Sequence, residues 1–403
     1  MPPSTDLDIA IVGAGVAGLA VAVGSAQLGL RTALIGPRAP AHRADAGAPF
    51  DARIYAIAPA SVALLEQLRV WPAVDPARLQ AVTRMRVFGD AGKELRFDAY
   101  QASLPQLATI VEEGELLRAL TTAAGFAAGL QRIEVPFDTL WMQDDKVGLA
   151  LADGQSVEAR LVVAADGARS AVRAAAGISA QELSYEQTAV VANFSCSQPH
   201  RGVAYQWFDP AAGVIALLPL PGEQVSLVWS APTALAQTLA ADAAELAHRL
   251  APRATPYLGT LRPVGAAHAF PLRRVTVDRL IGPRLALVGD AAHVVHPLAG
   301  QGLNLGMADV SELLRVVAAR EPWRDPGDAV LLRRYERSRA EAVGLMRFAT
   351  HGLARLFARD DAFSRELRNF GLAAVNAVPP LKHALVRHAA GSRADATPMI
   401  PRG

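Results

Sequence analysis

The chain has 403 residues, which exceeds the usual size of a single domain, so we expect two structural units with a substantial core. Its formal net charge is +2 and its arginines are spread without a dense basic run, which argues against binding to nucleic acid. The single cysteine, Cys196, excludes an internal disulfide and is typical of a reducing compartment.

The N-terminus, MPPSTDLD, lacks the basic start and apolar core of a secretory signal peptide, so we expect a cytoplasmic protein. Residues 9–30 carry no charge and are long enough to cross a bilayer. Three glycines in that stretch, however, have the GxGxxG spacing of a nucleotide-binding turn. This spacing favours a nucleotide-binding unit over a transmembrane helix.

The first 35 residues predict a βαβ unit. Its expected elements are a strand, a Gly-rich turn, a buried helix and a second strand: Asp8–Val12, 13–18, Leu19–Leu28 and Arg31–Ile35. Gly13 permits a tight turn, Gly15 lets the backbone approach a pyrophosphate, and Gly18 allows the helix to pack closely on the strand. The unit therefore predicts a dinucleotide site.

One expected part of this unit is missing from the sequence. Such units place an Asp or Glu about 20 residues after the first glycine to hold the ribose hydroxyls. Here the second strand ends at Gly36, and no acid occurs between Asp8 and Asp45. The ribose would be held by Arg38 or by backbone, and the unit alone leaves NAD, NADP and FAD open.

Residues 37–52 are rich in Pro, Ala and Gly and predict a loop. The segment DARIYAI (51–57) leads into a predicted helix, Ser61–Leu68, and places Arg53 just before it. On composition alone, a solvated loop arginine is the better interpretation of Arg53, and a ligand contact is the alternative.

The next predicted elements are a hairpin, a helix and a second strand pair: Met85–Phe88 with Glu94–Phe97, Ile110–Leu120, and Val147–Leu151 with Val157–Val163. The last strand ends in AADGARSAVR (164–173), where Asp166 follows the strand and Arg169 and Arg173 share a helical face. These groups can meet phosphates or a nicotinamide cofactor. An ordinary surface turn with a basic helix is the alternative.

Between Ser184 and Arg273 the pattern changes to strands broken by Pro and Gly, which predicts an inserted sheet domain. The expected strands are Thr188–Phe194, Val203–Phe208, Val214–Pro219 and Gln224–Ser230. Residues 308–350 are expected to be largely helical, and 351–403 to add further helix and a tail.

The most informative stretch is ALVGDAAHVVHPLAGQGLNLGMAD (286–309). It predicts a buried strand at Leu285–Val288, a Gly289-Asp290 turn and a helix that opens with GQGLNLG (300–306). Asp290 can accept a hydrogen bond from a ribityl hydroxyl, and the backbone of Gly300 and Gly302 can approach a flat ring. Because amides at a helix start stabilise negative charge, this stretch favours a flavin.

Two histidines in this stretch, His293 and His296, have HxxH spacing. A metal site needs several converging ligands, and the nearby acids are better used on the flavin. We therefore predict no metal site and assign these histidines to the shape of the pocket.

The ordered motifs GAGVAG, DARIYAI, AADGARSAVR and 286–309 resemble those of the single-component flavin aromatic hydroxylases, the class of p-hydroxybenzoate hydroxylase. The tail RNFGLAAVNAVPPLKHALVRHAAG (368–391) is most similar to the ubiquinone-biosynthesis hydroxylases. The resemblance implies an α/β fold with a Rossmann-like FAD-binding domain, an inserted β-sheet substrate domain and a helical C-terminus. The implied FAD-binding domain is discontinuous, at 1–76, 101–183 and 278–350. The substrate domain is 77–100 with 184–277, and 351–403 is a C-terminal region.

The resemblance also implies roles for individual residues. It assigns the three turn glycines and Asp166 to the FAD pyrophosphate, Asp166 also to the nicotinamide region, Arg53 to the flavin and Asp290 to the ribityl chain. The isoalloxazine contacts are Gly300, Gln301, Gly302, Leu303 and Asn304. The chain departs from the family in one place, because it has Glu113-Gly114 where the family tends to show an Asn-Arg pair.

The implied reaction is hydroxylation of a phenolic ring with NAD(P)H and O2, and the flavin carries the chemistry, so we assign no catalytic side chain. Pro219, Leu220 and Trp229 are candidate walls of the substrate pocket, and core packing is the alternative for each. The ring carbon and the choice between NADH and NADPH are open.

The implied substrate is a polyprenylated phenol in ubiquinone biosynthesis. Such a substrate would require contact with the inner face of the membrane, and association with other pathway enzymes is a further expectation. A C-terminal helix with Lys382 and Arg387 can lie on a membrane or cap the FAD domain. A hydroxylase of a small soluble aromatic and a non-catalytic flavoprotein subunit are the competing hypotheses.

Overall fold

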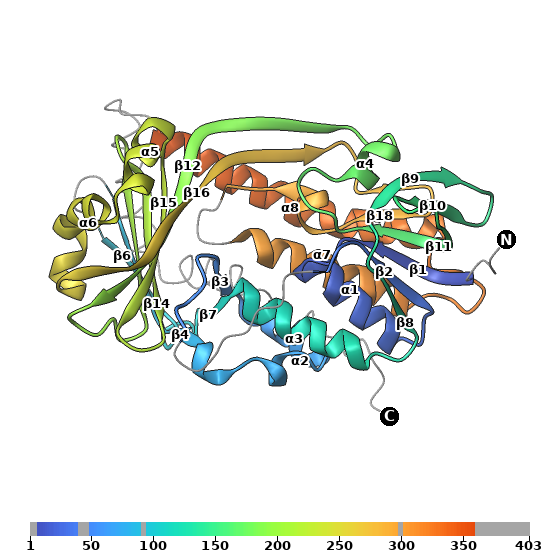
Figure 1. Cartoon of the computed structure of the whole chain (residues 1–403), viewed down its shortest axis with the longest axis horizontal. Helices are drawn as coiled ribbons and strands as arrows, with labels where there is room; N and C mark the ends of the chain where they lie inside the picture. The colour runs from blue at the N-terminus through green and yellow to red at the C-terminus, as the bar shows by residue number, and fades with distance from the viewer. Residues whose placement is uncertain (1–5, 39–47, 90–93, 297–300, 359–403) are drawn as a thin grey trace.

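The computed structural model describes residues 6–38, 48–89, 94–296 and 301–358, with side chains as far as Gly344. The molecule is elongated (Figure 1), with one β-sheet at each end and two long strands that run between them along one side. These strands are β12 (Ala180–Cys196) and β16 (Leu261–Val277), which pair antiparallel.

The sheet near the N-terminus is mainly parallel and forms the nucleotide-binding unit. Its order is β17-β18-β11-β1-β2-β8, and the β9–β10 hairpin pairs with β11. These strands are Ile281–Gly282, Leu285–Leu287, Ser156–Ala164, Asp6–Val12, Thr32–Ile35, Leu130–Ile133, Phe137–Met142 and Val147–Leu151. The chain passes from β1 to β2 on one side of β1, whereas β11 lies on the other side. The carboxyl end of β1 is thus a topological switch point, where such sheets bind ligands.

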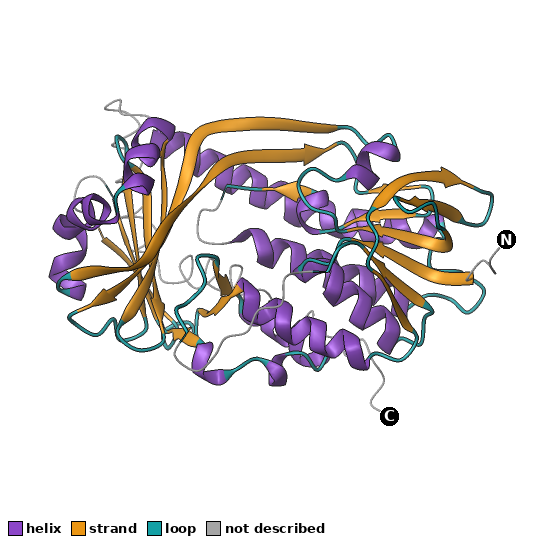
Figure 2. Cartoon of the chain, in the orientation of Figure 1, coloured by secondary structure: helices purple, strands orange, loops and turns teal. Residues whose placement is uncertain are grey.

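Helices cover one face of this sheet, as Figure 2 shows. The helices of this region are α1 (Val16–Gln27), α2 (Pro59–Gln67), α3 (Glu113–Phe126), α4 (Ala171–Ala175), α7 (Gln301–Ala318) and α8 (Ala329–Ala358). Helix α1 approaches α7 closely, since a Cβ atom at Gly24 would lie 2.4 Å from Leu314 Cδ1. Strands β1 and β2 are apolar and buried almost throughout, as is usual for strands inside a mainly parallel sheet.

The second large sheet has the order β19-β16-β12-β15-β14-β13-β5-β6. Its remaining strands are β5 (Arg84–Phe88), β6 (Glu94–Asp98), β13 (Val203–Asp209), β14 (Gly213–Leu220), β15 (Gln224–Pro232) and β19 (His293–Val294). Helices α5 (Thr233–Ala241) and α6 (Ala243–Leu258) cover one face with an apolar core. The opposite face packs in part on a three-stranded sheet, β3-β7-β4 (Ile54–Ile57, Ala108–Glu112, Gln80–Val82). Short 3-10 turns occur at Trp71–Ala73, Pro76–Arg78 and Gly289–Ala291.

Most elements predicted from the sequence are present, and the predicted helix at Ile110–Leu120 is partly wrong. Its first residues belong to β7, which lies between β3 and β4, and α3 begins only at Glu113. The run Thr109-Ile110-Val111 is β-branched, which suits a central strand more than a helix.

The alternative of a transmembrane segment at residues 9–30 is also wrong, because that stretch contains β1, the glycine turn and α1. Among the described helices, none combines the length and the apolar character needed to span a bilayer. The predicted C-terminal helix with Lys382 and Arg387 lies outside the described residues. The division into domains stays an interpretation.

Candidate active site

The glycine turn after β1 packs tightly on one side and is open on the other. Gly13 has φ +113°, and a Cβ atom there would lie 2.3 Å from Ala165 O. A Cβ atom at Gly18 would lie 1.9 Å from Gly13 O, so these two positions admit no side chain. A Cβ atom at Gly15 would meet no atom within 4 Å. The open side is therefore where a ligand can approach the backbone.

The N-terminus of α1 is available to bind an anion. Gly15 is the N-cap residue, and as a glycine it supplies no side-chain oxygen to cap the first turn. The first amides of a helix lack partners within the helix and carry partial positive charge. This arrangement fits a pyrophosphate group.

An acidic residue does lie near the expected ribose position, but it comes from a different strand. Ile35 of β2 pairs with Ile133 of β8, and Gly36 N donates to Ile133 O at 3.0 Å. Glu134 follows directly, and its Oε1 lies 4.0 Å from Nη1 of Arg38. The sequence pattern did not point to Glu134, because the ribose acid of such units is expected at the end of the second strand.

Asp166 lies directly beside the glycine turn, because its amide N would be 2.7 Å from a Cβ atom at Gly13. Its Oδ2 accepts a hydrogen bond from Val172 N at 3.1 Å. Its Oδ1 is buried and has no hydrogen-bond partner among the described residues. An orphaned carboxylate oxygen at this place can accept a hydrogen bond from a ligand or water.

The prediction that Arg173 meets phosphate is wrong. This residue is buried, and its guanidinium donates to Ala291 O at 2.8 Å and Ala168 O at 3.0 Å. It therefore ties the Asp166 turn to the Asp290 turn. Arg169 lies outside α4 and is exposed, so it does not share a helical face with Arg173.

The Gly289-Asp290 turn forms the expected junction between β18 and α7. Gly289 has φ +60°, and α7 approaches so closely that a Cβ atom at Gly306 would lie 3.0 Å from Gly289 Cα. The side chain of Asp290 is accessible to solvent although much protein surrounds it, as expected for a carboxylate in an open recess. Loss of hydration raises the pKa of this carboxyl, against the opposing effects of His293 and Arg53.

A buried charged cluster, which sequence reasoning missed, holds this turn in place. Asp309 of α7 accepts hydrogen bonds from Gly289 N at 3.0 Å, His293 Nε2 at 2.7 Å and Arg339 Nε at 2.7 Å. Burial acts to raise the pKa of Asp309, but the charges and hydrogen bonds of His293 and Arg339 hold it below its usual value. Tyr335 adds a bond from its hydroxyl to Leu287 O at 2.7 Å. His293 is thus a positioning residue.

His296 has a different environment. Its Nε2 lies 2.9 Å from Gln187 Oε1, and its ring meets Tyr185 edge-on with centroids 4.7 Å apart. Burial lowers the pKa of His296 to about 4, so the ring is neutral at pH 7. No group of three or more His, Cys, Asp or Glu suited to a metal ion occurs among the described residues.

Arg53 lies at the active-site end of β3, in a cluster with an acid and a phenol. Its Nη1 is 3.2 Å from Glu113 Oε2, and its guanidinium lies over the ring of Phe270, 5.0 Å from the centroid. Tyr55 donates its hydroxyl to Glu113 Oε1 at 2.8 Å. Burial and the charge of Glu113 raise the pKa of Tyr55. Arg53 and Glu113 also act on Asp290 electrostatically, so the three groups share one site.

Glu113 stands where the family tends to have Asn. In this chain it pairs with Arg53, and α3 begins at this residue. The adjacent Gly114 donates its amide to Asp51 Oδ2 at 3.0 Å, which ties the DARIYAI segment to α3. The departure from the family pattern thus has a structural role of its own.

Helix α7 begins at Gln301 with its first turn near this cluster. A Cβ atom at Gly302 would meet no atom within 4 Å, so the backbone there is open to a flat group. Leu303 packs partly against the main core. The side chain of Asn304 accepts from Ala58 N at 2.8 Å and donates to Ala56 O at 2.9 Å, so it joins α7 to β3. Gly300 lies outside the described residues.

The prediction that Trp229 lines the substrate pocket is wrong, and the alternative that it packs in the core is correct. Its ring lies in the core beneath α5 and α6, and its Nε1 donates to Ala212 O at 2.8 Å. Side chains alternate along a strand, so Pro219 lies on the same side as Leu217, which is in that core. Leu220 faces the other way and packs with Ile110 near the three-stranded sheet. Alternation alone could not tell which face looks toward the nucleotide unit.

The geometry fits FAD. The carboxyl ends of β1, β11 and β18 are followed by an open glycine turn, by Asp166 with its orphaned carboxylate oxygen and by the accessible Asp290. Helix α7 adds an open first turn at Gly302. A family model described as FAD binding domain matches residues 6–348. The ubiquinone hydroxylase UbiL of Rhodospirillum rubrum is 39% identical over 389 residues, 96% of this chain and 90% of that protein. The chain belongs to the FAD-dependent hydroxylases of ubiquinone biosynthesis.

Other relatives agree with this family. The 3-demethoxyubiquinol 3-hydroxylase of Escherichia coli is 36% identical, over 95% of this chain and 98% of its own length. Among solved structures, p-nitrophenol 4-monooxygenase PnpA of Pseudomonas putida matches with a TM-score of 0.75 and 17% identity, over 96% of this chain and 99% of its own. This last likeness shows the shared fold. The chain is therefore an FAD-dependent monooxygenase with NAD(P)H as reductant.

Proposed function

We propose that this enzyme hydroxylates the aromatic ring of a polyprenylated phenol on the route to ubiquinone, with NAD(P)H and O2 as co-substrates. The observation that carries the proposal is similarity along almost the whole chain to enzymes named ubiquinone hydroxylase and 3-demethoxyubiquinol 3-hydroxylase.

We assign cofactor contacts by their position in the site. The α1 amides with Gly13, Gly15 and Gly18 bind the pyrophosphate, and Asp166 Oδ1 accepts a hydrogen bond from the same region. Glu134 replaces the missing ribose acid, since it stands one strand further along the same sheet edge.

The flavin half of the cofactor lies at the other cluster. Asp290 accepts from a ribityl hydroxyl, and Arg53 places its charge beside the ring, where Glu113 fixes its direction. The backbone of 301–304, including Gln301, Gly302 and Leu303, borders the ring, and the start of α7 favours negative charge on it. When bound, FAD supplies the transfer of an oxygen atom to the phenol ring.

The side chains of this chain therefore bind and orient rather than exchange protons with the substrate. Tyr55 is held as a neutral phenol by its hydrogen bond to Glu113, and His296 is neutral as well. The buried Asp309 cluster keeps the Asp290 turn rigid. A rigid turn keeps Asp290 in one position for the cofactor.

A polyprenylated substrate resides in a bilayer, so we further propose that the enzyme works at a membrane surface, on the cytoplasmic face, and beside other enzymes of the pathway. A hydroxylase of small soluble aromatics is the alternative, and it predicts NADPH oxidation stimulated by simple phenols.

The test is deletion of the gene followed by extraction and mass analysis of quinones. The proposal expects an accumulating polyprenylphenol that lacks one ring oxygen, restored to ubiquinone by the wild-type gene but not by Asp290→Ala. The accumulated compound also identifies the ring carbon. Unchanged ubiquinone in the deletion strain would contradict the proposal.

A further inference from the structure

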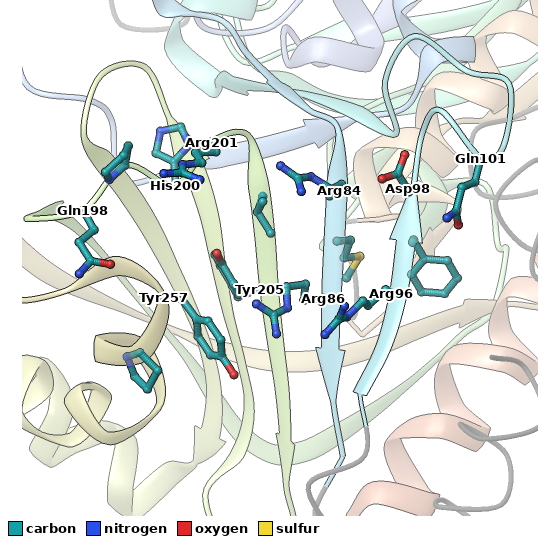
Figure 3. Close-up of a pocket in the computed structure, with 15 residues that line it drawn as sticks. Arg84, Arg86, Arg96, Asp98, Gln101, Gln198, His200, Arg201, Tyr205 and Tyr257 are labelled. Atoms are coloured by element: carbon teal, nitrogen blue, oxygen red, sulfur yellow. The ribbon is translucent and has the colours of Figure 1, made fainter.

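A cavity of about 720 Å³ lies in the second large sheet, at strands β5, β6 and β13, beside the C-terminal end of α6. Tyr205 and Tyr257 line it and belong to the α6 side of the sheet, whereas Ala204 faces the three-stranded sheet on the opposite side. The cavity is therefore distinct from the flavin site, which lies beyond that three-stranded sheet. Figure 3 shows the arginines of β5 and β6 with the two tyrosines beside them.

Four arginines line this cavity, which we call the arginine cavity: Arg84, Arg86, Arg96 and Arg201. Only part of their positive charge is neutralised by acidic side chains. Arg86 stands directly opposite Arg96 across the β5–β6 pair, where repulsion between the two positive charges is destabilising. Glu94 compensates, because its Oε2 accepts from Arg86 Nη2 at 3.0 Å and from Arg96 Nη2 at 2.8 Å. The pKa of Glu94 is lowered to about 2 by these arginines, so it is fully ionised.

Arg84 and Arg201 have no such partner. Within the part of the chain that the structure describes, no carboxylate forms an ion pair with either guanidinium, and both residues are exposed. Asp98 stands opposite Arg84 in register, but its Oδ1 accepts from Tyr100 N at 2.9 Å. The arginine cavity thus carries two more positive than negative charges, with Asp98 and Glu94 counted against the four arginines.

The backbone brings these two free arginines together. Val203, two residues after Arg201, is paired with Arg84 in the parallel β13–β5 ladder, and Thr83 N donates to Gly202 O at 3.0 Å. Arg201 has φ +53°, a conformation that non-glycine residues rarely adopt.

His200 holds this strained turn. Its Nε2 donates to Leu220 O at 2.8 Å, and its Nδ1 accepts from Gly202 N at 3.0 Å. A strained turn persists only when its surroundings impose it, and such turns are often functional.

The remaining walls fit an organic group larger than a free anion. Tyr205 and Tyr257 stack with centroids 5.2 Å apart, and Arg86 covers one face of Tyr257 at 4.4 Å from its centroid. The cavity volume falls in the range of about 300–1,000 Å³ that is usual for small-molecule sites. Guanidinium forks match the oxygens of phosphate, and two free positive charges match a dianion.

We propose that the arginine cavity binds a phosphate dianion carried on an organic group of nucleotide size, with Arg84 and Arg201 as its main contacts. The phosphate belongs either to a soluble nucleotide or to the headgroup of a membrane lipid. This site is separate from the flavin and does not depend on which phenol the enzyme hydroxylates.

The test measures binding to the FAD-loaded protein, so that the dinucleotide site is filled. Inorganic phosphate and AMP are titrated by calorimetry, and vesicles of phosphatidylcholine with phosphatidic acid are compared with vesicles of phosphatidylcholine alone by sedimentation. The variants are Arg84→Ala and Arg201→Gly. Glycine accepts the positive φ at position 201, so this variant removes the guanidinium without straining the fold. Arg262→Ala, an exposed arginine of β16 outside the cavity, is the matched control.

We expect each cavity variant to weaken binding roughly tenfold or more, because each removes a hydrogen-bonding charge. FAD content and the control should be unchanged. Binding of AMP identifies a soluble ligand, and binding only to phosphatidic acid vesicles identifies a lipid headgroup. Absence of binding to all three probes overturns the proposal, as does equal binding by the wild type and the cavity variants, or equal weakening by Arg262→Ala.

Discussion

The buried carboxylate of Asp309 offers the sharpest test of how the active-site turn is held. The substitution Asp309→Asn keeps the shape of the side chain but removes its charge and replaces one acceptor oxygen with an NH2 group. The wild-type oxygens accept hydrogen bonds from Arg339 Nε, His293 Nε2 and Gly289 N, and all three need an acceptor. In the asparagine variant the NH2 group faces at least one of these donors, and that donor loses its acceptor.

The size of the effect follows from burial. Asp309 is 0% exposed and Arg339 is 7% exposed, so the guanidinium would remain buried without a counter-charge. Breaking a buried ion pair by removing one partner costs about 3–5 kcal/mol. The free energy of unfolding should fall by that amount, and FAD affinity should fall as well because the Gly289-Asp290 turn loses its anchor.

The assay is urea unfolding followed by circular dichroism, with flavin absorbance after gel filtration as the second measurement. Glu312→Gln is the matched control, since Glu312 lies one turn further along α7 and pairs with the partly exposed Arg315. The free energy of unfolding of this control should fall by no more than about 1 kcal/mol. If Asp309→Asn proves no more destabilising than Glu312→Gln, the turn is not held as we describe.

Three further predictions follow from the site. Asp290→Ala should lose most of the affinity for FAD while circular dichroism and the free energy of unfolding stay near wild type; unchanged flavin occupancy would refute the ribityl assignment. Glu134→Ala should weaken FAD binding by about 1–2 kcal/mol through the lost ribose contact, measured by fluorescence titration of the apoprotein, and no change would return that role to the backbone. His296 has a folded pKa of about 4 against 6.5 unfolded, so its neutral form stabilises the fold above pH 6.5. The free energy of unfolding should therefore fall by about 3 kcal/mol as pH falls from 6.5 to 4. His296→Gln should remove that part of the pH dependence in urea unfolding, and a variant with the wild-type pH profile would contradict this assignment.

Local patterns in the sequence predicted the nucleotide-binding unit well, because each of its features acts between neighbouring residues. Gly13 and Gly18 are required where backbone meets backbone, and the turn before Asp290 needs a glycine with positive φ. Such requirements can be read along the chain. The predicted helix at Ile110–Leu120 was partly wrong because pairing with β3 and β4, both remote in sequence, decides that Ile110 is in a strand.

The sequence by itself determined the order of strands, turns and helices in the nucleotide unit and the family to which the chain belongs, since spacing and glycine positions are properties of the chain alone. Only the tertiary structure decided which face of each strand meets which neighbour. It buried Trp229 away from the three-stranded sheet, brought Glu134 beside Arg38, and joined Asp309, His293 and Arg339 around the Asp290 turn. The physical reason is that an ion pair or a packed face depends on distance in space, and residues far apart in sequence carry no local signal of their contact.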